Sequence, residues 1–225
     1  GTNALGFSGS FDTVDYPTSN MLYVGFNTQK GPCRDSGVRR ALQWGFDRSA
    51  VATVLLSRHA WSAALPISPA SAYYPEDLVE TLEYSPQMLT QTLSEAGWSQ
   101  SGDGWRKSGE TLALTLVVPT GNADRLAVAQ HLADGLGQEG IAVEVKALAW
   151  ADYLQALQKG EFDLYLGEVR LTADFDLTAL ITPNGTLNYG KYQDTEASSL
   201  LEAFRIASGQ GRDLAGRRLY ARLME

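Results

Sequence analysis

Four charged side chains fall within nine residues of one another: Glu168, Arg170, Asp174 and Asp176. Carboxylates bind ammonium groups, and guanidinium groups bind carboxylates or phosphates, in both cases through charge-assisted hydrogen bonds. This segment therefore has the chemistry to recognise a charged small molecule. An ordinary solvated loop would carry the same charges, so the elements that hold the segment must decide between the two interpretations.

A buried strand is predicted directly before these charges. Phe162, Leu164 and Leu166 alternate with the residues between them, and glycines bound the run. This is the period-two pattern of a strand with those three side chains on one face. Open α/β sheets bind ligands just beyond the carboxyl ends of their strands. The strand therefore favours the ligand-binding interpretation, and turn-forming residues further along place Asn188 and Tyr189 in the same region.

The sequence favours binding over catalysis. No nucleotide-binding glycine motif follows a strand, and GxSxG, HExxH and CxxC are absent. Asp174 and Asp176 would suit an acid–base pair, but side chains two residues apart on a strand or turn usually diverge, and no histidine accompanies them. We therefore expect no catalytic residues and no cofactor. An enzyme that uses Glu168, Asp174 and Asp176 remains the less favoured alternative.

Cysteine and histidine give no sign of a metal or redox site. Cys33 is the single cysteine, so no internal disulfide can form. His59 and His131 lie far apart in the sequence, and neither has a metal-ligand neighbour at helical or turn spacing. We expect all three residues to be functionally silent.

Composition limits the class of partner. The net charge is −8 and the pI is about 4.8, which disfavours nucleic acid, because phosphate binding needs basic surfaces. No apolar run approaches the roughly 18 residues of a membrane-spanning helix. The first residues, GTNALGFSGSFDT, lack the basic and apolar regions of a signal peptide. A globular chain with a substantial core is expected.

Strand and helix patterns alternate along most of the chain. Four strands are predicted, near residues 21–27, 111–118, 141–148 and 162–169. A hairpin is predicted between residues 102 and 111. These patterns predict an α/β (mixed α+β) fold, with a mixed sheet of at least four strands flanked by helices. The helices are predicted to begin after Asp35, Asp47, Ser85 and Asn122, and to cover residues 150–159, 195–207 and 212–225.

Apolar spacing within these elements predicts the core. The helix after Asn122 places Leu126, Ala129, Leu132 and Leu136 on one face, which we expect to be buried. Aromatic residues at strand or helix spacing are most often core residues. Trp44, Trp61 and Trp98 are assigned to the core on this basis.

Eight sequence blocks together resemble the bacterial extracellular solute-binding proteins of family 5, the peptide- and nickel-binding type that serves ABC importers. The resemblance covers residues 21–225 and implies a lobe of the periplasmic-binding-protein type. Residues 1–225 would form a single lobe, with the N-terminal lobe and the final C-terminal segment lying outside them. The blocks are FNT with VRRALQWGFDR, LPISP, YYPEDL, LEYSP, LSEAGW, DGWRKSGETLALTL, LGQEGIAVEV, and GEFDLYL with ADFD and LNYGKY.

The resemblance also implies which residues contact the solute. The family's Ala-Asp-aromatic motif supplies a carboxylate to a peptide's α-amino group, and 173–175 stand at that position, so Asp174 is the first candidate. The family's preceding tryptophan is Leu171 here, and its following proline is absent. These departures leave open whether the solute is a peptide, a nickel complex, a sugar or an opine-like compound. The implied ligand contacts are Asp174, Arg170, Glu168, Phe175, Asp176, Asn188 and Tyr189, whereas the VRRAL and FDR blocks are expected to be structural.

The function implied by the resemblance is solute capture for import. Two lobes would close on a small molecule or peptide, and the closed form would dock on ABC permease subunits in the membrane. The full-length protein would be an extracellular, membrane-anchored lipoprotein or a periplasmic protein, and a monomer without a metal site. The same lobe also occurs fused to DNA-binding domains, so a ligand-sensing domain of a transcriptional regulator is the alternative.

Overall fold

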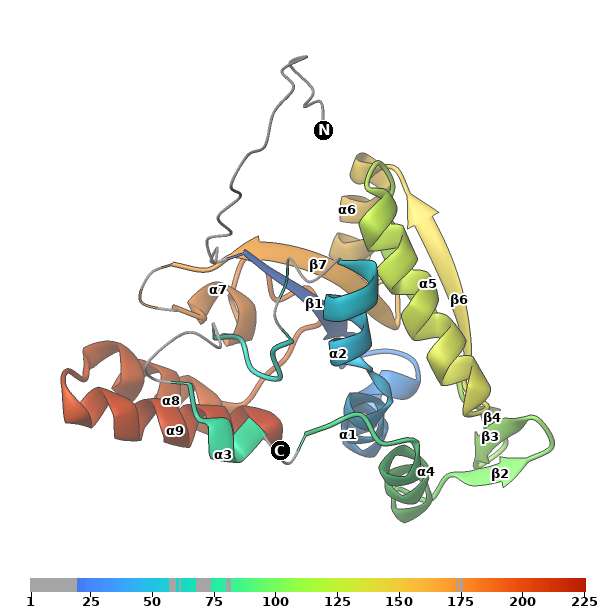
Figure 1. The fold of residues 1–225 in the computed structure, drawn as a ribbon, viewed down its shortest axis with the longest axis horizontal. Coiled ribbons are helices and arrows are strands. Elements are labelled where there is room, and N and C mark those ends of the chain that lie inside the picture. Colours follow the sequence, from blue (N-terminus) through green and yellow to red (C-terminus); the bar gives the residue numbers. More distant parts are fainter. Residues whose placement is uncertain are drawn as a thin grey trace, which may run out of the picture.

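A four-stranded mixed sheet forms the centre of the molecule (Figure 1). The computed structural model describes residues 20–56, 60, 62–67, 74–79, 82–172, 174 and 176–225. β5 pairs in parallel with β6 and β7, and β1 pairs antiparallel with β7. All four predicted strands and the predicted mixed sheet are confirmed. The strand order is β1 (Asn20–Phe26), β7 (Leu164–Arg170), β5 (Ala113–Pro119) and β6 (Ala142–Leu148).

Helices cover both faces of this sheet. α1 (Ser36–Gly45), α4 (Pro86–Glu95) and α5 (Ala123–Gln138) share one apolar core with β5, and α6 (Trp150–Lys159) packs on the opposite face. The side chains of β5 alternate accordingly: Leu116 and Val118 face the first core, and Val117 faces α6. The α/β class predicted from the sequence is therefore confirmed, with a doubly covered sheet.

Helix starts follow the predicted capping residues. The side chain of Asp35 accepts a hydrogen bond from Gly37 N at 2.8 Å, and that of Asn122 accepts one from Arg125 N at 3.0 Å. These bonds satisfy main-chain donors that the first helical turn leaves unpaired. Asp47 caps α2 (Arg48–Ala50), which continues as the π-helix η2 (Val51–Leu55), and Ser85 caps α4.

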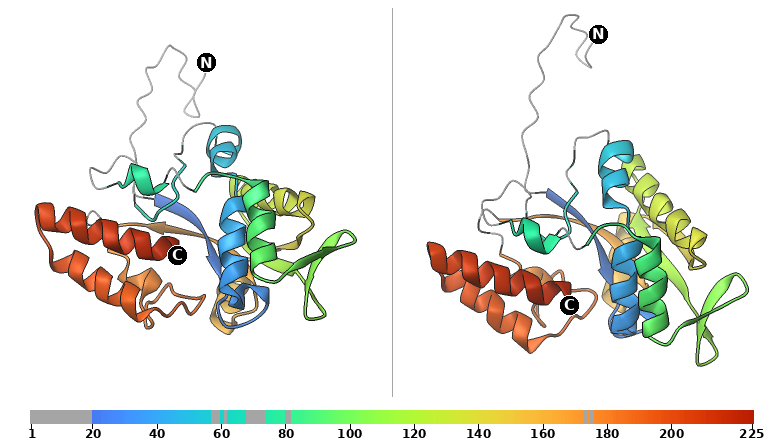
Figure 2. Two further views of the ribbon diagram at one scale, coloured as in Figure 1. Left: turned by 90° about the horizontal axis from the view of Figure 1, so that it is seen from below. Right: turned by 60° about the horizontal axis from the view of Figure 1, so that its bottom comes forward.

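Two smaller units extend from the sheet. β2 (Ser99–Ser101), β3 (Gly104–Lys107) and β4 (Glu110–Thr111) form an antiparallel three-stranded sheet at the predicted hairpin. α8 (Thr195–Ile206) and α9 (Gln210–Met224) form a helical hairpin with its own apolar core. Figure 2 shows this hairpin and the α1–α4 pair on opposite sides of β1. The remaining short helices are η1 (Pro32–Arg34), α3 (Glu76–Val79) and α7 (Thr178–Ile181).

Two predictions about side-chain direction were wrong. Phe162 was expected on the same face as Leu164 and Leu166, but it packs with Tyr165 against α6. It precedes the strand, whose first four residues are buried on both faces, so its place does not follow from strand alternation. Leu126 was expected in the core and is 40% exposed, because the buried face of α5 runs through Val128 instead.

The aromatic residues assigned to the core differ in how deeply they are buried, and the single cysteine is buried. Trp98 is buried and Trp44 is half-buried against the main core, whereas Trp61 lies outside the described residues. Cys33 is completely buried, and this burial raises the pKa of its thiol, so the unreactive thiol form dominates. His131 lies half-buried on α5.

His59 lies outside the described residues. Across the described ranges, no group of three metal-ligating side chains comes together. Within the same ranges, no helix is long and apolar enough to cross a membrane.

Two glycines of the β1–β7 pair leave room for two tyrosine rings, each of which lies over the glycine of the neighbouring strand. Tyr165 lies opposite Gly25, and Tyr23 lies opposite Gly167. A Cβ atom on Gly25 would lie 2.1 Å from the Tyr165 ring, and one on Gly167 would lie 2.7 Å from the Tyr23 ring. The two rings meet edge to face, with centroids 5.7 Å apart. Glycine at both positions is therefore needed for this aromatic packing.

Candidate functional site

The carboxyl ends of the three parallel strands meet at one edge of the sheet, which we call the carboxyl edge. It is formed where β5, β6 and β7 end, at Pro119, Leu148 and Arg170. Ligands of open α/β sheets bind beyond such an edge. α5 and α6 both begin here, so the partial positive charges of two helix N-termini also point towards it.

Glu168 and Arg170 lie at the carboxyl edge, as predicted from the strand pattern. Both occupy even-numbered positions of β7, so they share a face with Leu166. Glu168 forms an ion pair and a hydrogen bond with Arg125, from the first turns of α5. Arg170 is exposed, and its side chain makes no hydrogen bond or ion pair with another described residue. Arg125 was missed in the sequence because its proximity to Glu168 depends on how α5 packs over β7.

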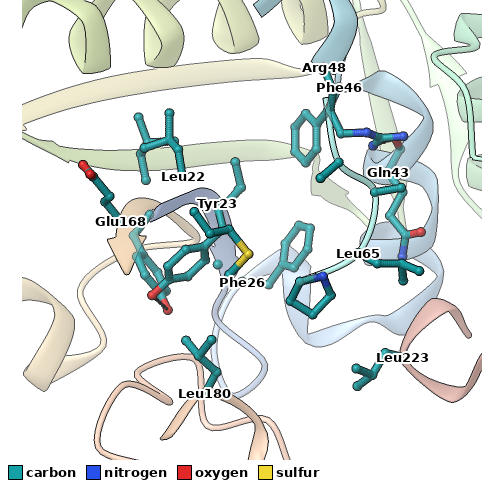
Figure 3. Close-up of a pocket in the computed structure, with 18 of the residues that line it drawn as sticks. Leu22, Tyr23, Phe26, Gln43, Phe46, Arg48, Leu65, Glu168, Leu180 and Leu223 are labelled. Atoms are coloured by element: carbon teal, nitrogen blue, oxygen red, sulfur yellow. Dashed lines mark hydrogen bonds between the residues drawn. The ribbon is translucent and has the colours of Figure 1, made fainter. Parts of the chain in front are cut away.

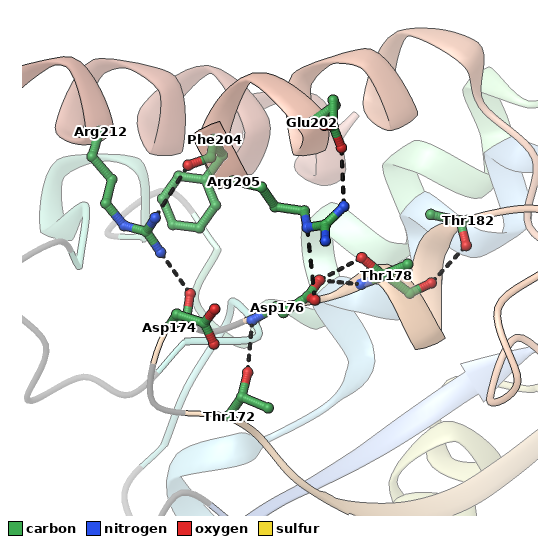
Figure 4. A network of polar contacts seen from close by, with 9 residues as sticks. All are labelled: Thr172, Asp174, Asp176, Thr178, Thr182, Glu202, Phe204, Arg205 and Arg212. Atoms are coloured by element: carbon green, nitrogen blue, oxygen red, sulfur yellow. Dashed lines mark hydrogen bonds and ion pairs between the residues drawn. The ribbon is translucent and has the colours of Figure 1, made fainter. Parts of the chain in front are cut away.

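Asp174 presents its carboxylate to solvent. Within the described part of the chain, this carboxylate makes no hydrogen bond or ion pair, and the residue is exposed. Its main-chain carbonyl accepts a hydrogen bond from Arg212 Nη2 at 2.7 Å (Figure 4). Arg212 also lies 4.1 Å from the centre of the Phe204 ring. The helical hairpin thus holds the main chain at Asp174 and leaves its charge available.

Asp176 has a different environment two residues further on. Its Oδ1 accepts hydrogen bonds from the amide and the hydroxyl of Thr178, and its Oδ2 lies 3.7 Å from Arg205 Nε. The hydrogen bond from the Thr178 hydroxyl is the main cause that lowers the pKa of this carboxyl. Asp176 therefore holds the chain at the start of α7 and links it to Arg205 of α8 (Figure 4).

Asn188 and Tyr189 lie in the loop that runs beside β1. Asn188 is buried, and its amide nitrogen donates to the carbonyls of Thr182 and Tyr192, each at 2.8 Å. Its amide oxygen accepts from Tyr192 N at 2.9 Å, so the side chain holds the loop together. Tyr189 packs edge to face on Tyr165, at 6.1 Å. Phe175, the remaining predicted contact, lies outside the described residues.

An exposed tryptophan at the carboxyl edge was missed in the sequence. Trp150 begins α6 directly after β6, is 59% exposed, and stacks on Tyr153 with ring centroids 5.5 Å apart. Tyr153 is held by a 2.8 Å hydrogen bond from its hydroxyl to the carbonyl of Leu166. A flat, supported ring at this edge can stack on a solute. Its place at the start of the helix after a predicted strand was the signal that could have found it.

A cavity of about 1230 Å³ adjoins this edge and continues along β1 (Figure 3). Apolar side chains dominate its walls, including Leu22, Phe26 and Phe46. Glu168 and Asn188 also line it, whereas Arg170, Asp174, Asp176 and Tyr189 do not. The structure therefore divides the predicted contacts between this cavity and the neighbouring surface.

The residues expected to be structural behave largely in that way. Asp47 caps a helix, and Arg39 donates to the carbonyls of Cys33 and Arg34. Arg48 donates to the main-chain carbonyls of Gln43 and Leu82.

Two of the three candidate carboxylates have partners of their own. Glu168 is bonded to Arg125, whereas Asp176 is bonded to Thr178 and lies beside Arg205. Each of these two carboxylates is thus held in place by its own neighbours. This arrangement suits recognition of a charged group better than proton transfer between carboxyl groups.

Comparisons with known proteins agree with the fold. The family model described as bacterial extracellular solute-binding proteins, family 5 middle, matches residues 4–190. The oligopeptide-binding protein AppA of Bacillus subtilis (strain 168) is 29% identical over 191 residues, which are 81% of this chain and 35% of AppA. Heme-binding protein A of Haemophilus influenzae is 25% identical, over 86% of this chain and 35% of its own length.

A solved structure gives the same result. The structure of Bacillus subtilis AppA in complex with a nonapeptide superposes with a TM-score of 0.81 at 26% identity, covering 92% of this chain and 43% of that one. The chain therefore spans less than half of the length of these relatives: 35% of AppA by sequence and 43% of the solved AppA chain.

Proposed function

The chain belongs to the bacterial extracellular solute-binding proteins, family 5, and we propose that it forms one of two lobes that close on a solute. The carboxyl edge would be this lobe's wall of the cleft. Hinge closure of two lobes around a ligand is a common binding motion. The match to the family over residues 4–190 is the observation that carries the proposal.

The proposed solute is a peptide or another small molecule with a cationic amino group. Two features support this choice: the exposed carboxylate of Asp174, and the similarity to a protein named for binding oligopeptides and solved with a nonapeptide. A fixed carboxylate gains from a charge-assisted hydrogen bond to an ammonium group. Glu168 and Arg170 would contact other polar groups of the solute, and Trp150 would stack on an apolar part.

The proposed partners are the permease subunits of an ABC importer. The full-length protein would act outside the cytoplasmic membrane, as an anchored lipoprotein or a periplasmic protein, and as a monomer. Nucleic acid is not a proposed partner, because the chain carries a net charge of −8. Catalysis is not proposed either, because Glu168 is paired with Arg125 and Asp176 is bonded to Thr178.

Mass spectrometry of solute co-purified with the full-length protein tests this function. We expect peptides or amino-bearing small molecules, released on denaturation and rebinding the stripped protein in calorimetry. The Asp174→Ala protein, purified in parallel, is the matched control and should retain less of the same solute. A purely anionic solute retained equally by both proteins would contradict the proposed recognition.

A further inference from the structure

The helical hairpin formed by α8 and α9 holds the segment that carries Asp174. Two arginines near the turn of the hairpin reach this segment: Arg205 at the end of α8 and Arg212 at the start of α9 (Figure 4). Arg205 Nε lies 3.7 Å from Oδ2 of Asp176. Arg212 Nη2 donates to the main-chain carbonyl of Asp174 at 2.7 Å. The hairpin therefore contacts the segment at two points.

Arg212 is itself held in place by Phe204. Its Nη1 donates to the Phe204 carbonyl at 3.2 Å, and its guanidinium carbon lies 4.1 Å from the centre of the Phe204 ring. Phe204 is only 1% exposed and packs on Tyr220 in the core of the hairpin, so it is a rigid support. The planar fork of an arginine can donate to two carbonyls while it stacks on a ring, and the compact ammonium of a lysine lacks this geometry.

The position of Arg212 in its helix is unfavourable for a positive charge. It is the third residue of α9, where the partial positive charge of the helix N-terminus repels a cation. The contacts of its guanidinium with Asp174 and Phe204 lie outside α9 and offset this repulsion. The placement of this arginine therefore follows from those contacts rather than from the needs of the helix.

The loop that carries Asp174 is also closed at its base. The main-chain amide of Asp176 donates to Oγ1 of Thr172 at 3.1 Å, which ties the two ends of the loop 172–176 to each other. Arg212 holds the carbonyl of Asp174 between these ends, and the Asp174 side chain stays exposed. A binding group whose main chain is already ordered loses less freedom when a ligand arrives, so it binds more tightly.

We propose that Arg212 is a positioning residue that determines how strongly Asp174 binds the amino group of a solute. This role rests on the proposed recognition of an amino group by Asp174. Arg212 does not touch the solute, and it acts by fixing the main chain from which the carboxylate extends. Loss of its guanidinium fork would leave the charge of Asp174 and the apolar core of the hairpin unchanged, but would let the carboxylate move.

Calorimetry on the full-length protein with two probes, trialanine and N-acetyl-trialanine, tests this role. The probes differ in the amino group that Asp174 would bind, so the ratio of their affinities measures that contact. The parent should prefer trialanine about 10-fold or more, as for a hydrogen bond to a charged group. Asp174→Ala should abolish this preference. Arg212→Lys keeps the positive charge but removes the fork, and it should reduce the preference about 3–10-fold without changing the affinity for N-acetyl-trialanine.

Arg218→Lys, at an exposed position of α9, is the matched control and should keep the preference of the parent. In the Asp174→Ala protein, Arg212→Lys should have no further effect, because the two residues act through one contact. An equal loss of affinity for both probes would make Arg212 a merely structural residue. That result, or an unchanged preference in Arg212→Lys, overturns the proposal and leaves the role of Asp174 intact.

Failure of the proposed function has a different signature. If the parent binds neither probe or shows no preference, or if Asp174→Ala keeps the preference, amino-group recognition and the role of Arg212 are both wrong. Should Arg212→Lys not fold, ¹⁵N relaxation of the unmodified, solute-free, full-length protein decides the question. A fixed main chain should give Asp174 a backbone order parameter near the rigid value of about 0.85, and a value under about 0.6, typical of flexible backbone, would overturn the proposal.

Discussion

At the scale of single residues, Asp174 and Asp176 show how two neighbouring carboxylates acquire different roles. Asp176 is occupied by Thr178 and lies beside Arg205, whereas the Asp174 carboxylate is exposed and its carbonyl is fixed by Arg212. Sequence spacing suggested that the two would diverge, and the structure shows in which directions. The two residues carry the same charge, but only the Asp174 carboxylate is free to bind a ligand.

Replacing Asp174 with alanine should weaken binding of an amino-bearing solute by about 1.5–3 kcal/mol, the range for hydrogen bonds to charged groups. Calorimetry on the full-length protein with its co-purified solute measures this loss. Asp103→Ala, in the exposed turn between β2 and β3, is the control and should leave the affinity unchanged. Equal affinity of Asp174→Ala and the parent would make the charged segment an ordinary solvated loop.

Gly25 is a second residue whose effect follows directly from geometry. A Cβ atom at this position would lie 2.1 Å from the ring of Tyr165, which is itself held between Phe162 and Tyr189. Gly25→Ala should therefore lower the free energy of unfolding by about 1–3 kcal/mol, as expected for an overpacked core. Denaturant unfolding of the parent and the variant gives this difference.

Gly211→Ala is the matched control for that experiment. Gly211 lies in α9, with no atom within 4 Å of the added Cβ. Alanine favours a helix by up to about 1 kcal/mol over glycine, so this variant should be neutral or slightly more stable. A stable Gly25→Ala protein would mean that the Tyr165 ring can move away.

At the scale of elements, Asp194 connects the start of α8 to the end of α9. Its Oδ1 accepts a hydrogen bond from Ala197 N at 2.7 Å, and its Oδ2 accepts one from Arg222 at 2.7 Å. The Arg222 hydrogen bond, followed by the Ala197 amide, lowers the pKa of the Asp194 carboxyl. A carboxyl with a lowered folded pKa stabilises the protein above its unfolded pKa of about 3.9. That stabilisation is lost as the pH falls through the folded value.

Two substitutions separate the helix cap from the charge. Asp194→Ala should lower the free energy of unfolding at neutral pH by about 1–2 kcal/mol, because it removes the cap as well as the ion pair. Asp194→Asn should cost less, because asparagine also caps helices. It should also flatten the dependence of stability on pH below about pH 5. Unfolding measured across a pH series tests both effects, and equal losses for the two variants would show that the cap contributes nothing.

Helices and strands could be predicted from the sequence where nearby residues determine them, as capping residues do for helix starts. Asp35, Ser85 and Asn122 cap helices as predicted, and the strand near residues 141–148 forms β6. Side-chain directions that depend on packing were less predictable. Phe162 lies on the unexpected face because it precedes β7, so the alternation of the strand does not set its direction.

The candidate site shows the same division between local and long-range information. Strand alternation placed Glu168 at the carboxyl edge, but its partner Arg125 comes from a helix 43 residues away. Likewise, Arg212 supports Asp174 from 38 residues away. Such pairs depend on how separate elements pack, and periodicity in one segment carries no signal for them.

At the scale of the whole molecule, the chain supplies one wall of a proposed two-walled cleft. Small-molecule sites bury about 70–90% of the ligand surface, and a single wall leaves much of it in water. Association also costs translational and rotational freedom, which the remaining contacts must offset. We therefore expect the isolated chain to bind the solute at least about 100-fold more weakly than the full-length protein, or not at all.

Calorimetry with the co-purified solute measures both affinities under identical conditions. Cooperative thermal unfolding of the isolated chain is the control, because it shows that weak binding does not result from a disordered protein.

Adding Asp174→Ala to each protein separates the effect of the missing wall from the effect of the carboxylate. In the full-length protein, this substitution should reduce the affinity, because closure desolvates the carboxylate and its partner. In the isolated chain it should change little, because an exposed ion pair contributes only about 0–1 kcal/mol. If the isolated chain binds the solute as tightly as the full-length protein, one wall is sufficient, and the proposal of a two-lobed cleft is wrong.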